Sequence, residues 1–189
     1  MKHYTLVLIT SLLITLSCCV EKPSSPLSDR SQKVEQKARA FFKTFADRND
    51  WDTFCSFYRE DMTFSDIMLQ LELDSLWQFK RFYNWDGEGD NFRKLTPDQE
   101  HVTIESLVVN DSTAVMTGHF NPFYYYDELI EPETGMAATI WLFFDENLKI
   151  KRQIDWIEYD LDVLQNVIDR VKENGMQEVP DWLDLSQDK

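Results

Sequence analysis

Apolar residues recur along the chain at two different spacings, which separate a helical part from a strand part. Between residues 32 and 83 they recur every three or four positions, the period of an amphipathic helix. From His101 onward they alternate with polar residues, the period of a β-strand with one buried face. The helical spacing returns after Asp160. This order predicts three helices and a short strand, then four longer strands, then a last helix.

Three segments of the helical part have an apolar face. The first begins at Ser31, a suitable N-cap, and its stripe consists of Val34, Ala38, Phe41, Phe42 and Phe45. The second begins at Asn49 or Asp50 and carries Trp51, Phe54, Cys55 and Tyr58. The third begins with a capping box at Ser75 and Gln78 and carries Leu76, Phe79, Phe82 and Tyr83. Residues 62–66 form a short extended piece between the second and third segments.

Four segments of the strand part are joined by turns, and we expect strands at residues 102–109, 113–120, 136–144 and 149–159. Residues 121–135 form the wide aromatic and acidic end of a hairpin. On the last strand Ile150, Ile154 and Trp156 share one phase, so Trp156 is expected to be buried against the helices. Helices segregated from an antiparallel sheet form an α+β domain, in which the helices cover one face of the sheet.

The first residues have the features of a secretory signal. Lys2 and His3 precede an apolar run of about 13 residues, which is too short to span a bilayer as a helix. The run ends at Ser17, Cys18 and Cys19, which resembles a bacterial lipobox, where a small residue precedes the cysteine that is lipidated. Cys18 has the small residue before it, whereas Cys19 has Leu16 at the usual distance, so we favour Cys18 and keep Cys19 as the alternative. An ordinary cleaved signal is the other interpretation.

These features divide the chain into four parts. We expect a signal peptide at residues 1–18, a tether rich in Pro and Ser at 19–31, a single domain at 32–175 and an acidic tail at 176–189. The domain is therefore expected to be lipid-anchored in the bacterial cell envelope, in the periplasm or at the cell surface. Its contact with the membrane would be through the N-terminal lipid alone.

The composition limits the chemistry of the domain. The chain has 34 acidic and 19 basic residues. Its net charge of −15 disfavours binding to nucleic acids and to anionic lipid surfaces. Only Cys55 lies inside the folded part, so no disulfide can form within the domain, and we interpret Cys55 as a small buried side chain. A calcium loop that starts at Asp86 would need Glu at its twelfth position, where Pro97 stands. We expect neither a metal nor a cofactor.

Several short segments, taken in order, resemble the NTF2-like superfamily and its SnoaL-like branch. They are FFKTF at residues 41–45, DWD at 50–52, MTFSD at 62–66, FDENLKI at 144–150 and DWIEY at 155–159. The resemblance covers residues 32–160 and implies a curved sheet that the N-terminal helices close into a cone with an apolar pocket. The helix after Asp160 and the large hairpin around residues 124–126 depart from the family's pattern and could cover the pocket or form a dimer contact. A homodimer through the sheet is a further expectation.

Two sets of residues are candidates for acid/base chemistry. Asp66 ends the first short strand, where the resemblance implies a carboxylate that lies at the pocket mouth and serves as a base; a turn or cap aspartate is the alternative. His119 and Asp155 lie two strands apart and could pair if they share a face. The alternative is that both belong to the outer, polar phase, because Phe120 and Trp156 suit the core better.

The pocket is expected to be lined by aromatic and aliphatic side chains of the helices and the sheet, namely Phe41, Phe45, Phe54, Phe79, Tyr83, Met116 and Phe120. A single carboxylate at its mouth, Asp66, would leave the charge of a transition state without a second stabilising group. The leading expectation is therefore a non-catalytic domain that binds a small apolar ligand or a protein partner. The alternative is a cofactor-free acid/base enzyme, an isomerase or dehydratase, that uses Asp66 with His119.

Overall fold

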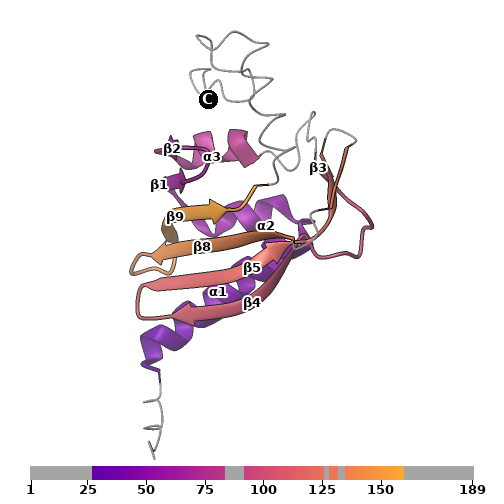
Figure 1. Cartoon of the computed structure of the whole chain (residues 1–189). Coiled ribbons are helices and arrows are strands. Elements are labelled where there is room, and N and C mark those ends of the chain that lie inside the picture. The colour runs from indigo at the N-terminus through magenta and orange to yellow at the C-terminus, as the bar shows by residue number, and fades with distance from the viewer. Residues whose placement is uncertain (1–26, 84–91, 126–127, 132–134, 160–189) are drawn as a thin grey trace, which may run out of the picture.

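The computed structural model describes residues 27–83, 92–125, 128–131 and 135–159 (Figure 1). The helices are α1 (Asp29–Asp47), α2 (Trp51–Ser56) and α3 (Leu76–Tyr83). The strands are β1 (Tyr58–Asp66), β2 (Leu71–Leu73), β3 (Phe92–Lys94), β4 (Val102–Val109), β5 (Thr113–Phe120), β6 (Phe123–Tyr125), β7 (Glu128–Ile130), β8 (Met136–Phe144) and β9 (Ile150–Ile157). The predicted signal, most of the tether, the loop at residues 86–90, the last helix and the acidic tail lie outside the described residues.

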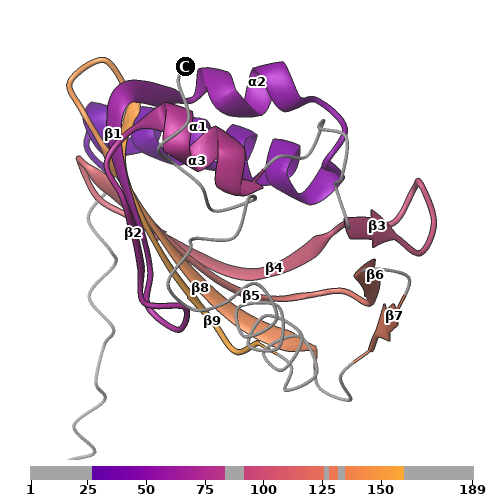
Figure 2. The ribbon, with the colours of Figure 1, turned by 90° about the horizontal axis from the view of Figure 1, so that it is seen from above.

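Six strands form one curved sheet in the order β2-β1-β9-β8-β5-β4, and β3, β6 and β7 form a small second sheet. All neighbours in the large sheet are antiparallel except β1 and β9, which run parallel. Figure 2 shows this sheet bending around the three helices, which cover one of its faces. The predicted α+β class and the predicted meander of β4, β5, β8 and β9 are confirmed. The strands β2, β3, β6 and β7 were not predicted, because each has only three residues.

The helices begin where side chains can accept their free N–H groups. Ser28, three residues before the predicted cap, accepts from the N–H of Ser31 at the start of α1, and Asp50 accepts from Thr53 at the start of α2. The guanidinium of Arg30 donates to the carbonyls of Asp111, Asp145 and Glu146, which fastens the first turn of α1 to two turns of the sheet. All five residues of the predicted stripe of α1 are buried.

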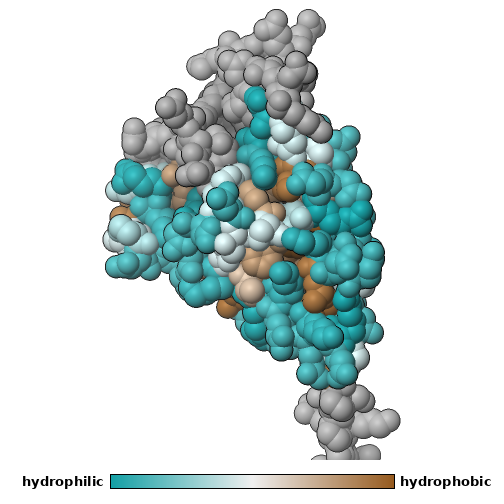
Figure 3. All heavy atoms as spheres, turned by 180° about the vertical axis from the view of Figure 1, so that it is seen from behind, coloured by the Kyte–Doolittle hydropathy of each residue, from teal (hydrophilic) through white to brown (hydrophobic). Residues whose placement is uncertain are grey.

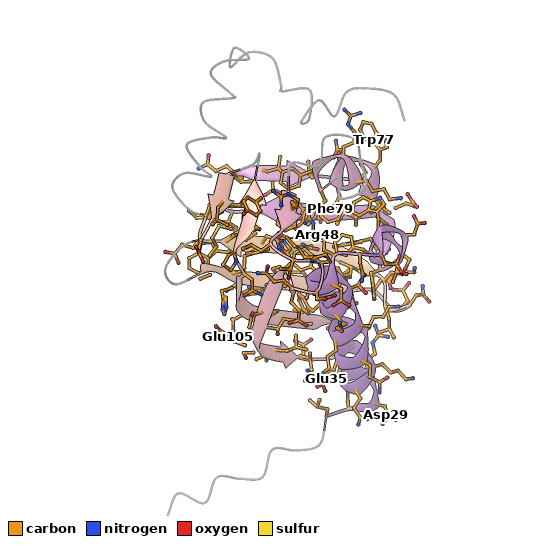
Figure 4. The ribbon with its side chains drawn as sticks, turned by 90° about the vertical axis from the view of Figure 1, so that its right-hand side faces the viewer. Asp29, Glu35, Arg48, Trp77, Phe79 and Glu105 are labelled. Carbon is orange, nitrogen blue, oxygen red and sulfur yellow. The ribbon has the colours of Figure 1, made fainter. Side chains whose placement is uncertain are left out.

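The core between helices and sheet is aromatic. The ring of Phe41 lies 5.3 Å from that of Phe54 and 5.5 Å from that of Phe57, measured between centroids. Figure 4 shows Phe79 directed from α3 into this interior, whereas Trp77 on the same helix points to the outer edge. Cys55 is buried beside the rings, as predicted. No helix among the residues that the structure describes is both long and apolar enough to cross a membrane.

The expected burial of Trp156 is wrong, because β9 contains a bulge. Phe143 pairs with Arg152 while the next residue of β8 pairs with Ile150, so Lys151 is left without a partner in the ladder. A bulge reverses the phase of the strand beyond it. Ile150 is buried as expected, but Trp156 lies on the outer face and is 57% exposed.

Candidate functional site

Asp155 lies on the inner face of the sheet, among the side chains that face the helices. The bulge at Lys151 puts Gln153, Asp155 and Ile157 on this face, and all three are buried. The side chain of Asp155 is fully enclosed, with an exposed fraction of 0%. A carboxyl group in such a place is stable only if hydrogen-bond donors surround it.

Two donors hold the carboxyl group of Asp155. The phenol of Tyr83 on α3 donates to Oδ2 at 2.7 Å, and Nε2 of Gln153 donates to Oδ1 at 2.8 Å. The phenol of Tyr58 on β1 donates to Oε1 of Gln153 at 2.6 Å, which fixes the orientation of that amide. Side chains from α3, β1 and β9 therefore form one continuous network in the interior.

Asp66 lies next to this network, at the end of β1. The parallel register of β1 and β9 places Asp66 opposite Asp155, and both side chains are buried on the same face. The N–H of Leu69 donates to Oδ1 of Asp66 at 2.9 Å, and the phenol of Tyr159 donates to Oδ2 at 2.5 Å. Asp66 thus is a turn residue, as one interpretation of the sequence held, and also half of a buried pair of carboxyl groups.

Burial raises the proton affinity of both carboxyl groups. The pKa of Asp155 rises from its ordinary value of 3.8 to about 7, mainly through loss of water and further through the charge of Asp66, while the donors Tyr83 and Gln153 oppose the rise. Burial also raises the pKa of Asp66, against the bonds from Tyr159 and from the turn. At neutral pH the Asp155 carboxyl is therefore divided between its neutral and charged forms.

The network borders an aromatic wall. The ring of Tyr83 lies 4.3 Å from that of Phe79, 6.0 Å from that of Phe54 and 5.8 Å from that of Phe64. Burial and the neighbouring Asp155 hold the pKa of the Tyr83 phenol well above its usual value, so this group remains a proton donor. An apolar wall beside two carboxyl groups is the kind of environment in which enzymes raise carboxyl pKa values.

The seven residues expected to line a pocket all lie in the interior. Six of them are buried and Tyr83 is half-buried; the six are Phe41, Phe45, Phe54, Phe79, Met116 and Phe120. Several of their rings pack directly on one another, since Phe41 and Phe45 lie 6.2 Å apart and Phe54 and Phe79 lie 6.1 Å apart. Packing therefore accounts for their aromatic character, and ligand binding by these side chains stays a prediction.

His119 and Asp155, considered as a candidate pair, do not pair, and only His119 lies on the outer face that the alternative gave to both. His119 lies on the outer face of β5, where its Nδ1 is 2.9 Å from Oε1 of Glu105. Asp155 faces the opposite side of the sheet, because the bulge at Lys151 reverses the phase of β9. The sheet therefore separates the two residues. The carboxyl group beside Asp155 in the register of β1 and β9 is that of Asp66, and the donors to Asp155 are Tyr83 and Gln153.

Sequence reasoning missed Gln153, Tyr58 and Tyr159 as members of the site. Tyr58 was assigned to the face of the second helix, but it begins β1. The only available signal was the DWIEY segment, which contains both Asp155 and Tyr159. Neither the bulge nor the parallel pairing of β1 with β9 leaves a local pattern that would have joined these residues.

Two other kinds of chemistry have less support in the described part of the chain. Among residues 27–83, 92–125, 128–131 and 135–159, no three His, Cys, Asp or Glu side chains come together as a metal site would require. Burial raises the pKa of the Cys55 thiol to about 11, which leaves little thiolate for nucleophilic attack at neutral pH. Asp86, which was considered above as the start of a calcium loop, lies outside the described residues.

Comparison with known proteins identifies the fold. No family model matches the chain, and no curated protein matches its sequence. Among solved structures, it is similar to a SnoaL-like polyketide cyclase from Shewanella putrefaciens CN-32, with a TM-score of 0.52 and 18% identity over 72% of this chain and 97% of that one. An NTF2-like protein from Anabaena variabilis ATCC 29413 gives a TM-score of 0.53 and 15% identity over 74% and 97% of the two chains.

A third similar structure is an LEH-like epoxide hydrolase from M. tuberculosis, with a TM-score of 0.53 and 9% identity over 78% of this chain and 98% of that one. Identities this low establish the shared architecture and leave the chemistry of each protein to its own residues. The curved sheet, the three helices on one face and these matches agree with the resemblance found in the sequence. The chain has the NTF2-like fold.

Proposed function

We propose that the chain is an acid/base enzyme of the isomerase or dehydratase type, which moves a proton on a small, largely apolar substrate. The observation that carries the proposal is the buried pair of Asp66 and Asp155. A group with a pKa of about 7, such as Asp155, exchanges protons most effectively near neutral pH.

The sequence favoured binding over catalysis because Asp66 was expected to stand alone. That reason no longer holds, since Asp155 lies opposite Asp66 and the phenols of Tyr83 and Tyr159 reach the two groups. Two neighbouring buried acids destabilise a fold compared with apolar residues of similar size. Such a pair is therefore more common in a functional site than in a purely structural core.

Each residue has a role in this mechanism. In its charged form Asp155 takes a proton from a carbon next to a carbonyl group, and the phenol of Tyr83 turns to the oxygen where negative charge develops. Asp155 then returns the proton to another carbon in an isomerisation, or to a departing hydroxyl group, which leaves as water. Burial, with a smaller contribution from the charge of Asp66, keeps the pKa of Asp155 high enough for both steps.

A second candidate is the non-catalytic binding of a small apolar ligand. The full hydrogen bonding and burial of the two carboxyl groups favour this function. All four of their oxygens have a donor, and both side chains are at most 2% exposed. A saturated network of this kind can also serve to orient the side chains around a ligand.

Deuterium exchange separates the two candidates. Neutral cyclic ketones with exchangeable hydrogens are incubated with the protein in D2O and followed by proton NMR. The enzyme hypothesis predicts exchange into at least one ketone, at a rate that rises with pH through about 7 and is lost in Asp155→Asn. Asp61→Asn, which changes an exposed carboxylate on β1, is the matched control and should retain the activity. Saturable binding of a ketone without deuterium exchange supports the binding function. If neither binding nor exchange is seen, both proposed functions are contradicted.

For the location, we propose that a lipid on Cys18 or Cys19 holds the domain in the bacterial cell envelope. The support is the short apolar run that ends at these cysteines and the tether rich in Pro and Ser that follows. Growth with a fatty-acid analogue should label the wild type. Labelling that persists when both cysteines are replaced by Ala would contradict the proposal.

A further inference from the structure

Tyr58 belongs to the site network, although it bonds to Gln153 rather than to a carboxyl group. Its phenol lies at the start of β1 and donates to Oε1 of Gln153 at 2.6 Å. Three aromatic rings hold it in place, since its centroid lies 4.8 Å from that of Phe79, 5.5 Å from that of Phe54 and 5.8 Å from that of Phe41. The hydroxyl group of Tyr58 therefore has a fixed place in the interior.

This hydroxyl group decides which end of the Gln153 amide faces Asp155. A buried hydroxyl hydrogen needs an acceptor, and within the described part of the chain Oε1 of Gln153 is the acceptor that Tyr58 reaches. The amide oxygen therefore faces Tyr58, and Nε2 faces Asp155, where it donates to Oδ1 at 2.8 Å. The reverse orientation would leave the phenol hydrogen without an acceptor and would turn one oxygen of the pair toward another.

The orientation of the amide determines which oxygen of a neutral Asp155 holds the proton. Oδ1 already accepts from Nε2 of Gln153, so a proton on this oxygen would meet a donor instead of an acceptor. Oδ2 lies 2.7 Å from the oxygen of Tyr83, and a hydroxyl oxygen both donates and accepts. The proton of the neutral acid is therefore on Oδ2 and points at Tyr83.

The hydrogen bond between Tyr83 and Asp155 consequently reverses with the charge of the carboxyl group. When Asp155 is charged, the phenol of Tyr83 donates to Oδ2. When Asp155 is neutral, Oδ2 donates to the phenol oxygen, which also accepts from Nε2 of Gln153 at 3.4 Å. The hydrogen of Tyr83 is then free to turn to another acceptor, such as an oxygen of a substrate.

The surroundings of the network keep water from competing with these bonds. From the side of the helices the molecule presents a mostly hydrophilic surface with apolar atoms between (Figure 3). Inside the fold, Tyr58, Gln153 and Asp155 are at most 4% exposed. Hydrogen bonds in such an interior are electrostatically stronger than in water, so a change in one donor alters the proton affinity of its partner.

We propose that Tyr58 and Gln153 are positioning residues, which keep the exchangeable proton of Asp155 on Oδ2, beside Tyr83. Their part in catalysis rests on the proposed acid/base function, whereas the position of the proton needs no substrate. In the catalytic step the C–H bond of the substrate breaks, its proton binds to Oδ2, and its electron pair moves toward the carbonyl oxygen. Oδ2–H then donates to the phenol oxygen of Tyr83, and the phenol hydrogen donates to the substrate oxygen as its charge develops.

An NMR titration of the Asp155 carboxyl carbon in Tyr58→Phe tests the proposal. This substitution removes the hydroxyl group and keeps the ring, so the Gln153 amide is free to turn its oxygen toward Asp155 and to accept the proton of the neutral acid. The neutral form is thereby favoured, and the midpoint should rise from about 7 to above about 8. Tyr124→Phe is the matched control, because it removes a hydroxyl group on β6, outside the network, and should leave the midpoint at about 7.

A double substitution tests whether Tyr58 acts through Gln153. Gln153→Leu removes the donor to Oδ1 and should also raise the midpoint of Asp155. Tyr58→Phe added to Gln153→Leu should then produce no further rise. The other groups that face Asp155, Asp66 on β1 and Tyr83 on α3, are the same in all these variants. A further rise as large as that in Tyr58→Phe alone would overturn the proposal, because Tyr58 would then act without Gln153.

The remaining outcomes separate this proposal from the proposed function. An unchanged or lowered midpoint in Tyr58→Phe would overturn the positioning role. If the wild type exchanges deuterium into a ketone, the pH dependence of the exchange rate should move to the same higher pH in Tyr58→Phe, and a profile that stays at about 7 would overturn the catalytic part. A raised midpoint in Tyr58→Phe without any exchange in the wild type would support the positioning and contradict the proposed enzyme.

Discussion

Replacement of Asp155 by Asn tests the central electrostatic feature of the site. The pKa of Asp155 is raised from 3.8 to about 7 in the folded protein, mainly by burial. In the folded state this group binds a proton that the unfolded chain releases above pH 4. Folding is therefore favoured most at low pH, and this stabilisation is lost as the pH rises through about 7.

The size of the effect follows from the difference between the two pKa values. A difference of about three units corresponds to about 4 kcal/mol between the low-pH and high-pH limits. Between pH 5 and pH 8 the wild type should lose about 2.5 kcal/mol from this one group. Asp155→Asn has no proton to lose at this position, so its unfolding free energy should fall less over the same range.

Urea unfolding followed by tryptophan fluorescence at pH 5 and pH 8 measures this difference. Asp111→Asn is a suitable control, because the hydroxyl groups of Ser28 and Ser31 hold the pKa of Asp111 below its usual value. The stabilisation that the Asp111 carboxylate provides is complete above pH 4. This variant should therefore lose the same stability at both pH values, and its unfolding free energy should change with pH as that of the wild type does. If the unfolding free energies of the wild type and of Asp155→Asn change equally between pH 5 and pH 8, the raised pKa of Asp155 would be refuted.

Three further substitutions test the packing. Phe54→Ala should cost about 3–5 kcal/mol in urea unfolding, because its ring is fully buried among other rings, and a cost under about 1 kcal/mol would mean a loose core. Trp156→Ala should change stability by less than about 1 kcal/mol, since the indole is mostly exposed; a large loss would place it inside. Gly118→Ala should destabilise the sheet measurably, since a Cβ there would lie 2.0 Å from the carbonyl oxygen of Thr103; unchanged thermal unfolding would argue against this close approach.

The elements that could be predicted are those in which every buried position is apolar. The stripe of α1, from Val34 to Phe45, contains only apolar residues, and all of them are buried. The strands β5 and β8 alternate regularly, so their bounds follow from their pattern. The turn predicted at residues 145–147 is also present. The side chain of Asp145 forms an Asx turn, since its Oδ1 accepts from the N–H groups of Asn147 and Lys149.

The site could be predicted only in part, because its geometry depends on long-range pairing. Asp66 and Asp155 were both candidates, but nothing in the sequence shows that β1 pairs in parallel with β9. The inner position of Asp155 depends on the bulge at Lys151, which has no sequence signal. Trp156 was misleading because both faces of β9 carry apolar residues, so size and hydrophobicity alone favoured the wrong phase.

An NMR titration of the Asp155 side chain tests the raised pKa of this group most directly. The chemical shift of its carboxyl carbon is followed from pH 3 to pH 9 and assigned by its absence in Asp155→Asn. The midpoint should lie at about 7, because burial and, to a smaller extent, the neighbouring Asp66 favour the neutral form. A midpoint near the ordinary value of 3.8 would contradict the buried carboxyl pair and, with it, the proposed role of Asp155 in proton transfer.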